Sequence, residues 1–99
     1  MHYLLIYDTA PSYASRRDTF RAAHLELAWQ SVARGELLGG AVGDSVESAL
    51  LLFRCESPEV PAAFATADPC VIHGLVTPWR VKLCNTVVDL EASNPIPVG

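Results

Sequence analysis

A histidine and an aspartate, His24 and Asp68, are the side chains of this sequence best suited to move protons. The pKa of an imidazole can be tuned across physiological pH, so histidine is the most common general acid or base in enzymes. An aspartate that accepts a hydrogen bond from one ring nitrogen fixes the tautomer and stabilises the imidazolium. The other nitrogen is then free to transfer protons. Local sequence marks no serine or cysteine as a nucleophile, so we expect proton transfer by His24 and Asp68.

Each of these residues also has a structural interpretation. His24 falls within the apolar arc of a predicted helix, where a histidine can simply be a hydrogen-bonded core residue. Asp68 precedes Pro69, and this pairing is common in ordinary turns. Arg21 lies one helical turn before His24, so a narrow polar strip runs along a face that is otherwise apolar. Both interpretations stay open at the level of sequence.

Three further residues are expected to line a ligand pocket. Tyr7 offers a phenol for hydrogen bonding, whereas Arg21 and Arg80 offer cations for an anionic substrate. Core packing for Tyr7 and a solvated strand face for Arg80 are the structural alternatives. His73 is interpreted as a surface residue.

The cysteines do not resemble a metal site. Cys55, Cys70 and Cys84 are an odd number without a CxxC pair, which is typical of a reducing compartment and of small core residues. We therefore expect no metal ligands and no cofactor. A haem is disfavoured too, because a single histidine is the only feature that suits an axial ligand.

The hydrophobic pattern predicts four strands and two helices, which must position these side chains. The first strand is apolar on both faces and should be central, whereas Pro78 should either interrupt the last strand or keep it at a sheet edge. Ser15 is the expected N-cap of the first helix, with Asp18 in its first turn, and Gly35 should end it. The predicted strands are residues 2–7, 37–42, 48–55 and 76–88, the predicted helices are residues 15–34 and 57–66, and a turn is expected at residues 43–45.

This order predicts an α+β protein with the βαββαβ arrangement of ferredoxin-like folds. The antiparallel sheet would carry both helices on one face. The strands are apolar on both faces, so the uncovered face would be a large exposed apolar patch, which monomers rarely tolerate. We therefore expect a homodimer that packs sheet against sheet.

Composition limits the class of protein. The chain has 99 residues, 51% of them hydrophobic and 18% charged, with seven basic and eleven acidic side chains and a net charge of -4. This describes one small domain at residues 1–90 with a proline-containing tail at residues 91–99, and it excludes a disordered chain. The acidic balance disfavours nucleic acid as a partner. The longest apolar run, residues 49–53, is too short to span a membrane, and we expect a cytoplasmic protein.

Six segments carry a family resemblance: residues 3–8 (YLLIYD), 21–25 (RAAHL), 38–40 (LGG), 49–53 (ALLLF), 67–69 (ADP) and 74–81 (GLVTPWRV). In this order they resemble the YciI-like (YCII-related) family of the dimeric α/β-barrel superfamily, over about Met1 to Val88. The resemblance implies a ferredoxin-like subunit whose sheet faces the sheet of a second subunit, with an active-site pair at His24 and Asp68. The sequence departs from the family pattern at Cys70, where an aromatic residue is expected, and at Pro78.

The resemblance also implies a class of chemistry. One relative removes chloride from a chlorinated hydroxyhydroquinone, which suggests cofactor-free elimination on aromatic rings. We therefore expect a homodimeric isomerase or lyase that acts on a cyclic or aromatic metabolite. Two alternatives are a small-ligand-binding or regulatory module without catalysis, and a dimeric scaffold in which His24 and Asp68 are satisfied core residues.

Overall fold

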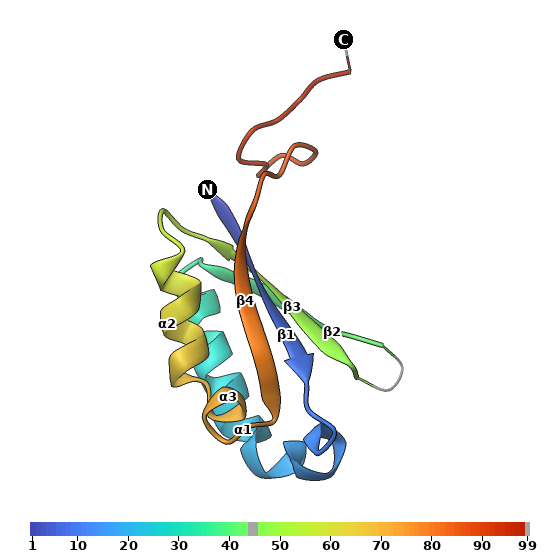
Figure 1. Cartoon of the computed structure of the whole chain (residues 1–99). Coiled ribbons are helices and arrows are strands. Elements are labelled where there is room, and N and C mark those ends of the chain that lie inside the picture. Colours follow the sequence, from blue (N-terminus) through green and yellow to red (C-terminus); the bar gives the residue numbers. More distant parts are fainter. Residues whose placement is uncertain (44–45, 99) are drawn as a thin grey trace.

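The chain folds as one sheet with helices on one side (Figure 1). The computed structural model describes residues 1–43 and 46–98, so Asp44 and Ser45 of the expected turn lie outside the described residues. The elements are β1 (His2–Thr9), α1 (Tyr13–Ala33), β2 (Leu37–Val42), β3 (Ser48–Arg54), α2 (Glu59–Ala67), α3 (Pro69–Ile72) and β4 (Val76–Cys84). None of the described helices is long and apolar enough to cross a membrane.

The sheet has the strand order β2-β3-β1-β4, with antiparallel neighbours throughout. The central position of β1 and the edge position of β4, which contains Pro78, are both confirmed. The short helix α3 adds to the expected order, and β4 ends at Cys84 rather than at Val88. The α+β, ferredoxin-like fold class is confirmed.

The core lies between the sheet and the helices. Leu5 of β1 pairs with Leu51 of β3, and both are buried on the face that the helices cover. Phe53 and Phe64 contact each other there edge to face, with ring centroids 5.4 Å apart. These side chains and Leu75 belong to one hydrophobic core, which packs α2, α3 and the central strands together.

Helix α1 is less buried than its apolar arc predicted. Phe20 and Leu27 pack against the core, but Leu25, Val32 and Trp29 are 39%, 38% and 67% exposed. Periodicity identifies the apolar side of a helix and does not tell how closely that side approaches the sheet. These three exposed side chains line a hollow between α1 and β2.

The start of α1 also differs from the sequence prediction. The helix begins at Tyr13, so Ser15 lies inside its first turn and donates its hydroxyl to the carbonyl of Ser12 at 3.0 Å. The predicted N-cap at Ser15 is therefore wrong. The predicted end is confirmed, because Gly35 adopts φ 75° and its N–H binds the carbonyl of Val32.

None of the described helices covers the other sheet face, which we call the open face. Its apolar side chains alternate with those of the core along each strand. Leu38, Leu50 and Val42 are exposed there, and Leu4, Ile6 and Leu52 are half-buried. Arg54 and Lys82 lie at its margin, together with an ion pair between Arg80 and Asp8.

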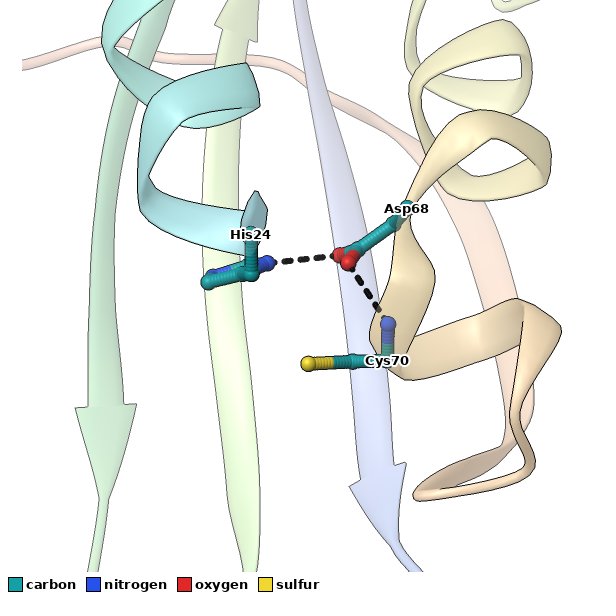
Figure 2. Close-up of side chains that lie close together, drawn as sticks. All are labelled: His24, Asp68 and Cys70. Atoms are coloured by element: carbon teal, nitrogen blue, oxygen red, sulfur yellow. Dashed lines mark hydrogen bonds and ion pairs between the residues drawn. The ribbon is translucent and has the colours of Figure 1, made fainter. Parts of the chain in front are cut away.

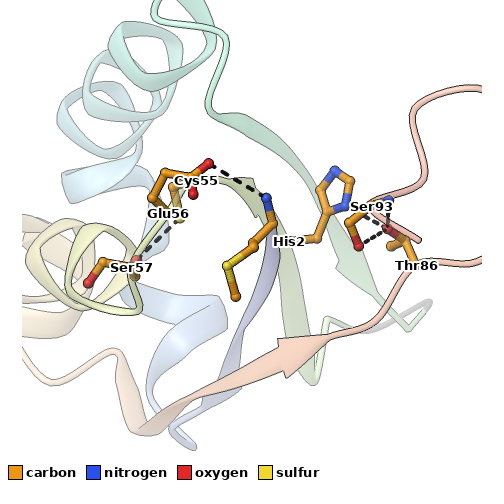
Figure 3. Close-up of polar contacts among 7 residues, drawn as sticks. His2, Cys55, Glu56, Ser57, Thr86 and Ser93 are labelled. Carbon is orange, nitrogen blue, oxygen red and sulfur yellow. Dashed lines mark hydrogen bonds and ion pairs between the residues drawn. The ribbon is translucent and has the colours of Figure 1, made fainter.

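Polar contacts tie the C-terminal segment to the first strand (Figure 3). His2 Nδ1 lies 2.6 Å from the hydroxyl of Thr86, which also accepts a hydrogen bond from the backbone of Ser93. Arg54 binds both carboxylate oxygens of Glu91. The tail therefore begins from a fixed position at the end of the sheet that holds the N-terminus.

Candidate functional site

The helical conformation is interrupted between α2 and α3 at Asp68, one of the two residues predicted to transfer protons. Asp68 ends α2 and caps α3, with an extended backbone at φ −73° and ψ 122°. The following proline favours this conformation, because its ring clashes with a helical residue before it. Asp68 Oδ1 then accepts the backbone N–H of Cys70 at 2.9 Å. This turn directs the carboxylate inward, where its exposure is 0%.

The carboxylate of Asp68 joins three elements of the fold. Its Oδ2 atom lies 2.8 Å from Nδ1 of His24 on α1 and accepts the hydroxyl of Tyr7 on β1 at 2.9 Å. Figure 2 shows His24 and Asp68 pointing toward one another from α1 and the α2–α3 junction. Buried carboxylates are costly unless their oxygens are hydrogen-bonded, and here three donors satisfy them.

This arrangement defines the tautomer of His24. A carboxylate can only accept hydrogen bonds, so Nδ1 carries the ring proton and donates it to Asp68. The remaining nitrogen, Nε2, is then an unprotonated base in the neutral ring. The His24 side chain is 25% exposed, whereas Asp68 is sealed behind it.

The buried charge affects its neighbours. Burial raises the pKa of the Tyr7 hydroxyl, and the charge of Asp68 and its hydrogen bond raise it further. Burial also raises the pKa of the Cys70 thiol to about 11, and the charge of Asp68 contributes to this shift. Tyr7 therefore stays a hydrogen-bond donor and Cys70 stays a neutral thiol at neutral pH.

A cavity of about 480 Å³ lies beside this site, between α1 and the strands β2 and β3. Its volume is within the range of small-molecule sites, which is roughly 300–1,000 Å³. His24 and Cys70 line one part of it, and the exposed side chain of Trp29 lines another. His24 is therefore the member of the pair that is accessible from the cavity, whereas Asp68 is buried behind it.

The structure places the predicted site residues in two different regions. His24 and Arg21 line the cavity, and Asp68 binds His24 from behind. The expectation that Tyr7 and Arg80 line a pocket is wrong for this cavity. Tyr7 is buried on the core face and binds Asp68, whereas Arg80 pairs with Asp8 at 2.9 Å on the open face. Alternation separates the two faces of a strand but does not tell which one faces the site.

Other residues of the cavity received no functional prediction from sequence. Arg17 and Trp29 line the cavity from α1, and neither has a role predicted from the sequence. Gly39 and Gly40 line the cavity from β2. Their unusual place in a strand was the available signal, because glycines there favour a close approach by a ligand or another backbone.

His24, Asp68 and Cys70 also bring together three types of metal-ligating atom. One ligand atom from each lies within 4.8 Å of the others (Figure 2). Three hydrogen bonds already occupy most of the lone-pair sites of the Asp68 carboxylate. Burial raises the pKa of the Cys70 thiol to about 11, whereas a metal ligand must be a thiolate. The donor set therefore fits a proton-transfer dyad better than a metal centre.

We expect Tyr7→Phe to lower the free energy of unfolding by about 1.5–3 kcal/mol, because it removes a hydrogen bond to a buried carboxylate. Urea denaturation followed by circular dichroism measures this. Tyr3→Phe is the matched control, since Tyr3 is buried in the same strand and its hydroxyl makes no hydrogen bond within residues 1–43 and 46–98. Equal losses in the two variants would contradict the role of Tyr7.

We expect the free energy of unfolding to fall as the pH rises from about 9 to about 11. The pKa of Cys70 rises from its usual 9.0 to about 11 on folding, so the unfolded chain loses this proton first and is favoured by alkali. Urea denaturation measured across this pH range should show a smaller fall in the free energy of unfolding for Cys70→Ala than for the unmodified protein. A Cys84→Ala variant should behave like the unmodified protein, and an unchanged slope in Cys70→Ala would contradict the assignment.

Comparison with known proteins identifies a similar structure. No protein-family model matches the chain, and no curated protein does. Among solved structures, the chain is similar to 5-chloro-2-hydroxyhydroquinone dehydrochlorinase from Burkholderia phenoliruptrix AC1100, in complex with 2,5-dihydroxybenzoquinone. The TM-score is 0.71 at 23% sequence identity, and the match covers 87% of this chain and 95% of the other. At this identity the likeness establishes a shared fold.

Proposed function

We propose that this protein is a cofactor-free enzyme that moves protons on a small cyclic or aromatic molecule, as an isomerase or a lyase. The observation that carries the proposal is the 2.8 Å contact between His24 Nδ1 and a fully buried Asp68, at the wall of a ligand-sized cavity. Asp68 orients the ring and stabilises its protonated form, as in other dyads of a base and an orienting carboxylate. His24 Nε2 is the base.

The proposed step keeps protons and electrons balanced. Nε2 of His24 takes an acidic proton from the bound molecule, and the electron pair of the broken bond moves into the ring. In an isomerisation, the same imidazolium returns a proton to a different atom. In an elimination, a leaving group departs with its bonding pair from a neighbouring carbon. General acid–base catalysis of this kind contributes about 10²–10⁴-fold to a rate.

The similar solved structure supports the choice of substrate class. That protein is a dehydrochlorinase of a chlorinated hydroxyhydroquinone, and its structure holds a dihydroxybenzoquinone. The fold likeness, together with the His24–Asp68 contact, also supports our proposal that this chain is a YciI-like protein. A six-membered ring with acidic hydroxyls is therefore our first candidate substrate.

We expect His24→Gln to lower turnover by about 10²–10⁴-fold, because glutamine cannot take the proton. Chloride release from 5-chloro-2-hydroxyhydroquinone measures elimination, and the appearance of the rearranged product from cyclic enols and ketones, followed by NMR, measures isomerisation. Asp68→Asn should also lose most of its turnover, since an amide no longer stabilises the imidazolium.

His73→Gln is the control for His24→Gln. His73 is exposed, stacks on Phe20 and does not line the cavity, so its substitution should leave turnover unchanged. Full turnover in His24→Gln would refute the mechanism. A bound ring compound that the unmodified protein releases chemically unchanged would favour a binding module instead.

We also propose that residues 1–90 form the domain, with residues 91–99 as its tail, and that two copies pack through the open face. The exposed apolar side chains of Leu38 and Leu50 lie on a face that no described helix covers. A second copy would thus bury the apolar face that this small chain leaves open.

We expect the protein to sediment at twice its mass of 10.7 kDa at micromolar concentration, and Leu50→Glu to sediment as a monomer. A buried carboxylate without a partner strongly disfavours an interface. Leu90→Glu is the matched control, because Leu90 is fully exposed in the C-terminal segment. A monomeric unmodified protein, or a dimeric Leu50→Glu variant, would refute this interface.

A further inference from the structure

The cavity differs in charge from the rest of the molecule. The chain has eleven acidic and seven basic side chains and a net charge of -4. Within the part of the chain that the structure describes, no acidic side chain lines the cavity, and the arginines that line it are Arg17 and Arg21. An acidic protein thus presents a local cationic surface next to its candidate base, His24.

The two arginines and His24 share one face of α1. They follow one another at intervals of four and three residues, which places them on one side of a helix. With a helical rise of 1.5 Å per residue, Arg21 lies about 4.5 Å and Arg17 about 10.5 Å from His24 along the axis. One small ring can therefore contact the arginine side chains at one end and His24 at the other.

These arginines are weakly engaged by the protein itself. Arg17 lies 3.9 Å from the carboxylate of Asp18, which is 91% exposed to water. Within residues 1–43 and 46–98, Arg21 takes part in no ion pair or side-chain hydrogen bond. Surface pairs such as that of Arg17 contribute little, so both guanidinium groups keep donors for a ligand.

The remaining walls of the cavity suit a planar apolar body. Leu25, Ala28 and Trp29 continue the cavity-lining side of α1 beyond His24. Opposite them, Gly39 lies on the core face of β2, and a Cβ atom there would come within 3.4 Å of Leu51 Cγ. A larger side chain at Gly39 would occupy the space between β2 and α1, so the glycine keeps this slot open.

We propose that the ligand of this cavity is a planar ring that carries an ionised acidic group, a phenolate or a carboxylate, bound by Arg21 and Arg17. This inference rests on the proposed function, because it places the reacting part of that ring at His24. Arginine donors match the two oxygens of a carboxylate and the single oxygen of a phenolate. A neutral ring would offer these two cations no anionic partner.

Equilibrium binding tests the proposal without turnover. The charged probe is 2,5-dihydroxybenzoquinone, whose acidic hydroxyls are ionised at neutral pH, and the neutral probe is 2,5-dimethoxybenzoquinone. Isothermal titration calorimetry should show tighter binding of the charged ring to the unmodified protein. Arg21→Met and Arg17→Met should each weaken that binding by about ten-fold or more, and leave binding of the neutral ring unchanged. Arg21→Lys should recover part of the loss.

Arg16→Met is the matched control. Arg16 carries the same charge on the same helix, but it lies over the ring of Phe20 at 5.7 Å and does not line the cavity. Its substitution should leave the affinity for the charged ring within about two-fold. An equal loss in Arg16→Met would show that net charge alone drives binding, and would overturn the proposal. So would equal affinity for the two rings, or no binding of the charged ring to the unmodified protein.

His24→Gln separates this inference from the proposed function. The variant should still bind the charged ring through its arginines, although it has lost its base. If the arginines discriminate between the two rings but His24→Gln keeps full turnover, the anion site stands. The proposed mechanism is then refuted. Loss of turnover in His24→Gln with no discrimination between the rings would refute only the anion site.

Discussion

The burial of one carboxylate is the constraint on which the rest of this structure depends. Asp68 is fully enclosed, and its oxygens are satisfied by donors from β1, α1 and the first turn of α3. Removing any donor leaves a charged group partly unpaired away from water, which costs far more than a surface hydrogen bond. The three elements are therefore fixed relative to one another by a polar contact inside an apolar core.

This constraint explains how a poorly buried helix can carry a precisely placed base. Helix α1 has 21 residues, of which only Ser31 is classed as buried, so apolar contacts hold it less firmly than they hold β1. The bond from His24 to Asp68 adds a directional attachment in the middle of the helix. The cavity can then stay open on the side of β2 without leaving the imidazole free to rotate.

The sequence was sufficient for features that depend on local patterns. Two-sided apolar alternation identified β1 as a central strand, Pro78 indicated an edge, and the Asp68-Pro69 pair marked the helix break. Features that depend on the distances between elements could not be predicted from the sequence. Ser12 and Ser15 can both cap a helix, so the start of α1 was placed two residues late. The role of Tyr7 needed the observation that its face of β1 meets Asp68.

The enclosure of Asp68 also determines the route by which protons can enter and leave. Its carboxylate does not line the cavity, and it offers no exposed surface through which water could exchange a proton. Under the proposed mechanism, a proton taken up by His24 Nε2 would therefore depart through the same opening that admits the ligand. While that opening is occupied, the proton is confined with the molecule that released it. Such confinement favours return of the original proton over exchange with solvent. A proton that moves between two atoms of the bound molecule would therefore seldom be replaced by deuterium from the solvent.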